Sequence, residues 1–244
     1  MKAIQTIGLV KQYQNLIAVD RLDLEVEQGE LFALLGVNGA GKTTTIKMLT
    51  GLICPTSGEG RVGGYSITES PEKIKERIGV SPQETAVAPN LSVKENLELI
   101  CGIHGFSKEK TREKIKELCD TLGLDSVLGR RAGKLSGGWQ RRLSIAMALV
   151  SEPKILFLDE PTLGLDVIAR SELWEEIRAL KGKVTIILTT HYMEEAHALA
   201  DRIGIMKSGR LLICGTAQEL IQKAGASSFE NAFIALVKEE NLCG

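Results

Sequence analysis

The feature that most constrains the fold of this chain is a glycine-rich segment between an apolar run and a helix-forming stretch. The segment reads Gly36, Val37, Asn38, Gly39, Ala40, Gly41, Lys42, Thr43 and Thr44. It follows Leu31–Leu35, an uninterrupted apolar run typical of a parallel strand buried on both faces. Glycines let backbone N–H groups converge on an anion, and the N-terminus of the next helix adds positive charge. The pattern predicts a phosphate-binding loop, with Lys42 at the β- and γ-phosphates and the Thr43 hydroxyl on Mg²⁺.

Two adjacent acids follow a second apolar run. Ile155–Leu158 is typical of another buried strand, and Asp159 and Glu160 come directly after it. Two acids at a strand end are common in isolation and are usually solvated. In a chain that also carries a phosphate loop, we interpret Asp159 as a metal ligand and Glu160 as the group that polarises an attacking water.

The remaining pattern alternates strands with helices and indicates an α/β fold with a mostly parallel sheet flanked by helices. Further strands are expected at Ile4–Leu9, Ala18–Val26, Ile78–Val80 and Val184–Leu188, with a hairpin of Ile203–Met206 and Leu211–Cys214. One helix is expected to start at Ser70-Pro71 and to stop at Gly79. Capping boxes at Ser92/Glu95 and Thr216/Glu219 predict two more helix starts, the second helix ending at Gly225, and an apolar stripe in Lys108–Leu122 indicates another helix. Residues 88–150 look almost entirely helical, which predicts an inserted helical subdomain.

Composition excludes several other classes of protein. The 244 residues suit one large domain or two small ones, and the net charge of -1 and 4% aromatic residues argue against nucleic-acid binding. No apolar run reaches the roughly 18 residues of a membrane span, and Met1–Gln14 does not have the pattern of a signal peptide. The 5 cysteines include no C-x-x-C pair, which favours reduced cytosolic thiols.

A third motif restricts the choice among proteins that contain a phosphate-binding loop. Leu135, Ser136, Gly137 and Gly138 offer a second helix N-terminus that can bind an anion. With this motif the chain resembles, from Tyr13 to about Leu220, the nucleotide-binding domain of ATP-binding cassette (ABC) transporters. The resemblance implies one ABC ATPase domain over 1–244, with a P-loop NTPase core (1–87 and 151–215), an N-terminal antiparallel β portion, a helical signature subdomain (88–150) and C-terminal helices (216–244). It also implies a head-to-tail dimer, in which Ser136, Gly137 and Gly138 complete the partner's ATP site.

Four more positions are similar to family motifs in the same order. The resemblance implies that Tyr13 stacks on adenine, that Gln83 contacts Mg²⁺ and the attacking water, that Asp166 belongs to a loop facing the opposite subunit, and that His191 contacts the γ-phosphate. The competing interpretations are a strand tyrosine, a surface glutamine, a simple turn and a structural histidine, the class in which we place His104 and His197. The chain departs from the family at Trp139, often glutamine, and at Val167, often proline.

The resemblance implies an ATPase that uses ATP and Mg²⁺ to drive a separate transmembrane permease. The expected partners are that permease and a second, identical cassette, with no nucleic acid, at the cytoplasmic face of the cell membrane. The segments 139–146 and 170–174 look most like bacterial exporter-type cassettes for drugs or lipids. A soluble assembly-scaffold ATPase is the main alternative. A chromosome-maintenance ATPase would need coiled-coil arms between the two motifs, and a small-molecule kinase has no use for Ser136–Gly138.

Two surface features have competing interpretations. The basic cluster of Arg130, Arg131, Lys134, Arg141 and Arg142 is interpreted as a solvated helical face, with phospholipid or nucleic-acid contact as the alternative. The tail Ser227–Gly244 carries apolar residues at helical spacing and is expected to pack as a terminal helix. A regulatory or dimer contact is the alternative for the tail.

Overall fold

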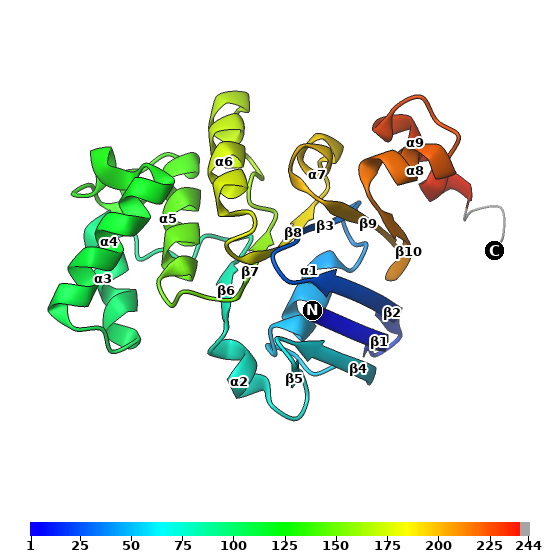
Figure 1. The fold of residues 1–244 in the computed structure, drawn as a ribbon, viewed down its shortest axis with the longest axis horizontal. Coiled ribbons are helices and arrows are strands. Elements are labelled where there is room, and N and C mark those ends of the chain that lie inside the picture. Colours follow the sequence, from blue (N-terminus) through cyan, green and yellow to red (C-terminus); the bar gives the residue numbers. More distant parts are fainter. Residues whose placement is uncertain (240–244) are drawn as a thin grey trace.

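The computed structural model describes residues 1–239 and contains a six-stranded sheet, which lies at the centre of the molecule (Figure 1). The strand order is β10-β9-β3-β8-β7-β6. Its strands are β3 (Leu31–Gly36), β6 (Ile78–Ser81), β7 (Ile155–Asp159), β8 (Thr185–Thr190), β9 (Arg202–Lys207) and β10 (Arg210–Gly215). Every neighbouring pair is parallel except the β9–β10 hairpin. The mostly parallel sheet predicted from the apolar runs is therefore confirmed.

A second, antiparallel sheet packs beside the first, as expected for the N-terminal part. Its order is β2-β1-β4-β5, formed by β1 (Lys2–Tyr13), β2 (Leu16–Glu27), β4 (Ser57–Val62) and β5 (Tyr65–Ser66). The β1–β2 pair was visible in the sequence as two runs of period two. Strands β4 and β5 were not expected, and β4 owes its place to pairing with β1, as in the Ile4–Val62 register.

Helices begin at each of the three predicted signals, Ser70-Pro71, Ser92/Glu95 and Thr216/Glu219. The helices are α1 (Lys42–Leu49), α2 (Pro71–Lys75), α3 (Val93–Ile103), α4 (Lys108–Leu122), α5 (Gly137–Leu149), α6 (Val167–Leu180), α7 (Met193–Leu199), α8 (Ala217–Lys223) and α9 (Phe229–Glu239). Both capping boxes form, at α3 and α8. One prediction was wrong: α2 ends at Lys75, and Gly79 lies inside β6 rather than stopping the helix. A Cβ at Gly79 would lie 2.2 Å from the Ala148 carbonyl oxygen, so glycine is required there by close packing against α5.

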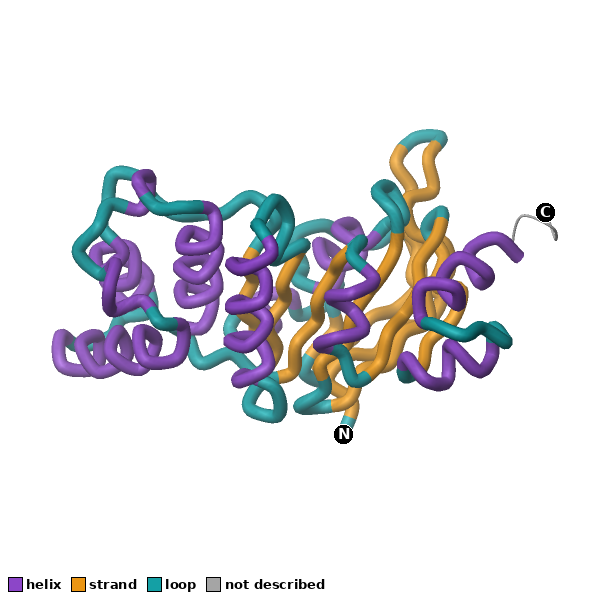
Figure 2. The backbone as a smooth tube through the Cα atoms, turned by 90° about the horizontal axis from the view of Figure 1, so that it is seen from above, coloured by secondary structure: helices purple, strands orange, loops and turns teal. Residues whose placement is uncertain are grey.

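Helices α3, α4 and α5 lie together at one end of the molecule, beyond the edge strand β6 (Figures 1 and 2). The regular elements between 88 and 150 are all helical, as the sequence predicts. Whether the proposed boundaries delimit an independent subdomain stays a prediction.

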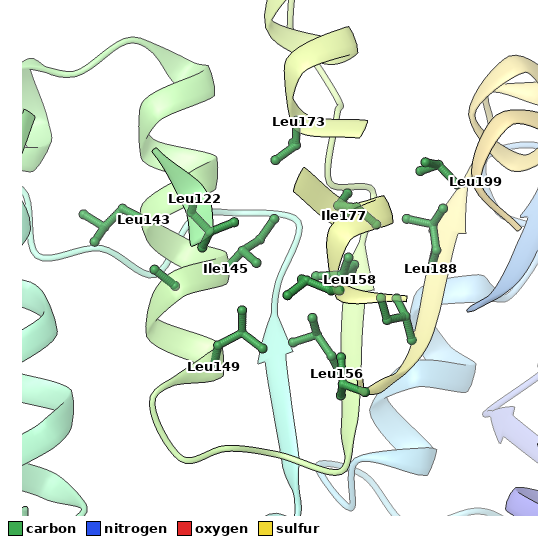
Figure 3. Close-up of a cluster of buried hydrophobic side chains, with 14 of the residues drawn as sticks. Leu122, Leu143, Ile145, Leu149, Leu156, Leu158, Leu173, Ile177, Leu188 and Leu199 are labelled. Atoms are coloured by element: carbon green, nitrogen blue, oxygen red, sulfur yellow. The ribbon is translucent and has the colours of Figure 1, made fainter. Parts of the chain in front are cut away.

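The central sheet is buried on both faces because its strands alternate their side chains between two clusters. Leu31, Ala33 and Leu35 face the cluster that contains α5, α6 and α7, whereas Phe32 and Leu34 face the N-terminal sheet and α1. Figure 3 shows the first cluster, where α5 and α6 pack over Leu156 and Leu158. This two-sided burial holds the carboxyl ends of the strands in place.

The basic cluster is only partly a solvated face. Arg130, Arg131 and Lys134 are exposed, but Arg141 and Arg142 are 4% and 8% exposed and both are partnered. The interpretation of these two arginines as solvated was therefore wrong, because α5 turns them toward β6 and α6.

The terminal helix is present as α9, where Phe229 is buried and its ring stacks on His197 at 5.4 Å. The last part of the predicted tail, 240–244, lies outside the described residues. Over 1–239, no helix has the combination of length and hydrophobicity that crossing a bilayer requires.

Candidate nucleotide site

The phosphate-loop sequence forms the turn between β3 and α1. Gly41 has φ +102°, and a Cβ there would lie 2.5 Å from the Ala18 carbonyl oxygen. Helix α1 begins at the next residue, Lys42. The loop therefore presents backbone N–H groups beside a helix N-terminus, the arrangement that favours bound phosphate.

Lys42 is turned back over its own loop. Its Nζ donates to the carbonyl oxygens of Gly36 (2.7 Å) and Val37 (3.3 Å) and lies 3.1 Å from Glu160 Oε1. The side chain is 5% exposed, so this charge is held by short contacts with little access to solvent. A phosphate entering the loop would compete with Glu160 for the ammonium group.

Glu160 and His191 meet across the ends of two neighbouring strands. His191 Nδ1 lies 2.6 Å from Glu160 Oε2, while Lys42 holds the other carboxylate oxygen. The Glu160 backbone has φ +50°, and its N–H donates to both the carbonyl oxygen and the hydroxyl of Thr189, at 3.1 Å each. The strained backbone is thus fixed by the adjacent strand, which points the carboxylate at Lys42 and His191.

The residues predicted to hold Mg²⁺ include a close pair of oxygens. Thr43 Oγ1 donates to Asp159 Oδ1 at 3.2 Å, and the Thr189 hydroxyl donates to the same carboxylate oxygen. Mg²⁺ prefers a hydroxyl and a carboxylate of this kind, together with phosphate oxygens and water. The donor set of Thr43 and Asp159 therefore fits the ion.

One cavity of about 730 Å³ collects most of the predicted nucleotide residues. It is lined by Tyr13, the loop residues Asn38–Thr44, Gln83, Glu160 and His191. Tyr13 is 44% exposed at the cavity edge, which leaves its ring accessible to a base. Leu16, Ile17, Ala18, Leu163 and Ser208 also line the cavity and were not predicted.

The signature residues lie elsewhere. Ser136 is the N-cap of α5, its hydroxyl makes no capping hydrogen bond, and both Ser136 and Gly137 are exposed. Asp166 caps α6 by accepting from the Ala169 amide at 2.9 Å. Neither the Ser136–Gly138 segment nor Asp166 lines the phosphate-loop cavity. The predicted residues Gly36, Val37 and Asp159 are also absent from the cavity lining.

A further acid is buried close to this site. Glu195, on α7, accepts hydrogen bonds from the Thr162 hydroxyl (2.8 Å) and the Trp174 indole (3.1 Å). Burial raises the pKa of the Glu195 carboxyl, and the nearby Glu160 acts in the same direction. Neither Glu195 nor Thr189 was predicted from the sequence. Thr189 was detectable because it precedes His191 at the end of a buried strand.

A family model described as ABC transporter matches residues 19–163. The chain is 44% identical over 227 residues to the daunorubicin/doxorubicin resistance ATP-binding protein DrrA of Streptomyces peucetius, covering 93% of this chain and 69% of DrrA. It is 43% identical over 222 residues to human phospholipid-transporting ATPase ABCA3, covering 91% of this chain and 13% of ABCA3. The chain therefore corresponds to most of one relative and to a small part of the other.

Comparison with solved structures indicates the same family as the sequence comparisons. The ATP-binding subunit of an ABC transporter superposes with a TM-score of 0.85 at 28% identity, covering 96% of this chain and 99% of that chain. The dimeric bacterial ABC transporter cassette MJ0796 superposes with a TM-score of 0.78 at 26% identity, covering 87% of this chain and 98% of that chain. These matches confirm the resemblance and the fold class predicted from the motifs. The chain belongs to the ABC transporter family and is one of its ATP-binding ATPase subunits.

Proposed function

We propose that this subunit hydrolyses Mg-ATP at the interface of a head-to-tail cassette dimer and so drives a separate transmembrane permease that exports its cargo. The observation that carries the proposal is the convergence of Lys42 and His191 on Glu160 beside the phosphate-loop cavity. This convergence supports the assignment of a base, a cation and a hydrogen-bonding imidazole to one γ-phosphate.

The residues around the phosphate-loop cavity form the first half of the ATP site in this proposal. Tyr13 stacks on the adenine, and the loop Gly36–Thr44 holds the phosphates. Thr43, Asp159 and Gln83 would hold Mg²⁺, which when bound would supply charge neutralisation for the phosphates. Entry of the γ-phosphate draws Lys42 away from Glu160, which frees the carboxylate to orient a water for in-line attack. His191 and Lys42 then steady the charge that develops.

The second half-site comes from another copy of the chain. Ser136, Gly137 and Gly138 offer an uncapped helix N-terminus outside the cavity, so a partner cassette is needed to bring them to the phosphate. Val167 and Ile168, beside Asp166, are 79% and 72% exposed and suit an apolar contact. The dimeric MJ0796 cassette, also described in a post-hydrolysis state with ADP and Pi, supports this assembly.

The cargo and the partner are inferred from relatives. DrrA is named for resistance to two drugs, and ABCA3 is named as a phospholipid transporter. An amphipathic drug-like or lipid cargo, carried by a permease at whose cytoplasmic side this subunit sits, follows by analogy. Co-purification with an integral membrane protein is the expected result, whereas its consistent absence would favour the scaffold alternative.

Glu160→Gln tests the catalytic core of the proposal. The variant retains ATP binding and forms a nucleotide-dependent dimer, measured by light scattering, while turnover falls by about 10²–10⁴-fold because the general base is lost. Glu72→Gln, an exposed acid on α2, is the matched control and leaves turnover unchanged. Normal hydrolysis by Glu160→Gln would show that the base is another group, and a monomer with ATP bound would contradict the dimer.

A further inference from the structure

One face of α5 runs along the edge strand β6 and the segment that follows it. Ala148 lies against Gly79, where a Cβ would come 2.2 Å from its carbonyl oxygen. Ser144 Oγ lies 2.9 Å from Ser81 Oγ in a buried hydrogen bond. The helix residues 141, 144 and 148 share this face because their spacing follows the helical repeat.

Arg141 continues the same face beyond the end of the strand. Its Nη1 donates to the Pro82 carbonyl oxygen at 2.6 Å, and its Nη2 donates to the Gln83 carbonyl oxygen at 2.7 Å. The planar guanidinium thus holds two successive carbonyls with its rigid fork. Burial lowers the pKa of Arg141, while the negative charges of Asp159 and Glu195 favour its charged form.

These contacts join two parts of the proposed site that are far apart in sequence. Gln83 lines the phosphate-loop cavity, whereas Arg141 lies on the helix whose N-terminus is Ser136. We propose that Arg141 is a positioning residue that fixes the Gln83 backbone to α5, so that Gln83 moves together with the signature helix. The inference rests on the proposed function of Gln83 and Ser136, and it adds a residue to which neither the motif pattern nor the comparisons assign a role.

The neighbouring arginine provides a matched control. Arg142 is also buried on α5, but its guanidinium pairs with Glu172 (2.7 Å) and Glu176 (3.0 Å) on α6. It also stacks on Trp139, 4.6 Å from the ring centroid. Replacing Arg142 removes the same chemical group from the same helix without touching the Gln83 segment.

The first measurement is amide hydrogen exchange without nucleotide, which needs no activity. The probe is the Ala88 amide in the segment that follows Gln83, which donates to Asn96 Oδ1 at 2.8 Å. In Arg141→Met we expect this amide to exchange at least about tenfold faster than in the wild type, because opening of the segment no longer breaks two charge-assisted hydrogen bonds. Arg142→Met leaves exchange of the Ala88 amide unchanged. Equal exchange in the wild type and Arg141→Met would overturn the proposal, and so would an equal increase in both variants.

The second measurement is the Mg²⁺ dependence of ATP hydrolysis. Loss of a group that orients a metal-contacting segment costs about 10–100-fold in metal affinity or activity. We expect Arg141→Met to raise the half-activating Mg²⁺ concentration by about tenfold and to lower kcat, with KM for ATP at saturating Mg²⁺ changed less than about twofold. Arg142→Met should leave the Mg²⁺ dependence unchanged.

If Arg141→Met does not fold, Arg141→Lys is measured instead: lysine keeps the charge but loses the planar fork of two donors, so exchange of the Ala88 amide must still rise. If the wild-type protein does not hydrolyse ATP, the proposed function fails, while the exchange experiment still tests the Arg141 contacts. A wild-type Mg²⁺ dependence in Arg141→Lys together with unchanged exchange would overturn the inference.

Discussion

Thr189 connects Asp159 and Glu160 through its hydroxyl. Removing this hydroxyl should lower both the free energy of unfolding and the rate of ATP hydrolysis, and the two losses can be measured separately. The hydroxyl donates to Asp159 Oδ1 and accepts from the Glu160 N–H at 3.1 Å. The residue is fully buried in β8. Thr189→Val keeps the shape and removes only the hydroxyl. At the other end of the same strand, Thr185 is also buried, and its hydroxyl accepts from the Gly29 N–H at 3.0 Å.

The expected loss of unfolding free energy in each variant depends on the hydrogen-bond partners of the threonine hydroxyl. Thr185→Val loses one neutral hydrogen bond and should cost about 1 kcal/mol of unfolding free energy. Thr189→Val loses a hydrogen bond to a carboxylate and weakens the hold on the Glu160 amide, so it should cost about 3 kcal/mol. The difference of about 2 kcal/mol measures the charge-assisted contact with Asp159.

The assay pairs urea unfolding with ATP hydrolysis and ATP binding for both variants. We expect hydrolysis to fall about 10–100-fold in Thr189→Val, because the metal carboxylate and the base both lose their orienting group. Thr185→Val hydrolyses ATP at the wild-type rate. Equal losses of stability in the two variants, or wild-type turnover in Thr189→Val, would refute the assigned role of this hydroxyl.

Burial raises the pKa of Glu176 from 4.5 to about 7, an effect that Arg142 only partly offsets. The folded protein keeps this proton up to a higher pH than the unfolded chain, so the contribution of Glu176 to the unfolding free energy falls as pH rises from about 5 to 7. Glu176→Gln should reduce that fall by about 2 kcal/mol in urea unfolding. Gly79→Ala should lower the unfolding free energy by about 1–3 kcal/mol, because its Cβ would collide with the Ala148 carbonyl oxygen and overpack the contact. The matched change Gly102→Ala, in a position on α3 with open space around it, should stabilise by up to about 1 kcal/mol in the same thermal or urea assay.

Local pattern was enough to predict most of the elements that position the site. The buried strands were visible as apolar runs, and the α3 and α8 starts were visible as capping boxes, because these signals lie within a few residues. Strand β4 carried no such signal: Ser57–Val62 contains two glycines and alternates weakly. Its pairing with β1 supplies the stability that its own sequence lacks, and this long-range partner cannot be read from a single segment.

Site residues could be predicted from the sequence where they belong to one local motif. They could not be predicted where their hydrogen-bond partners come from distant segments of the chain. The phosphate loop, Glu160 and His191 follow from their position after buried strands. Arg141 was misinterpreted as solvated because charge in a helix says nothing about burial until its acceptors, the Pro82 and Gln83 carbonyls, are known. The same holds for Glu195, whose donors come from two other elements.

The register of the central sheet explains why the first half-site needs only one chain. Thr189 in β8 is paired with Leu34 of β3 on one side and with Asp159 of β7 on the other, so the carboxyl ends of three parallel strands stop at one level. The residues that follow these ends, in the phosphate loop, at Glu160 and at His191, must then converge. The N-terminus of helix α5 at Ser136, by contrast, does not line the phosphate-loop cavity. Moving Ser136 to the phosphate loop of its own chain would require breaking the contacts of α5 with Gly79 and Ser81 of β6 and with Gln83 beyond the strand. A second chain can supply the anion site without that cost, which is the physical reason to expect the dimer.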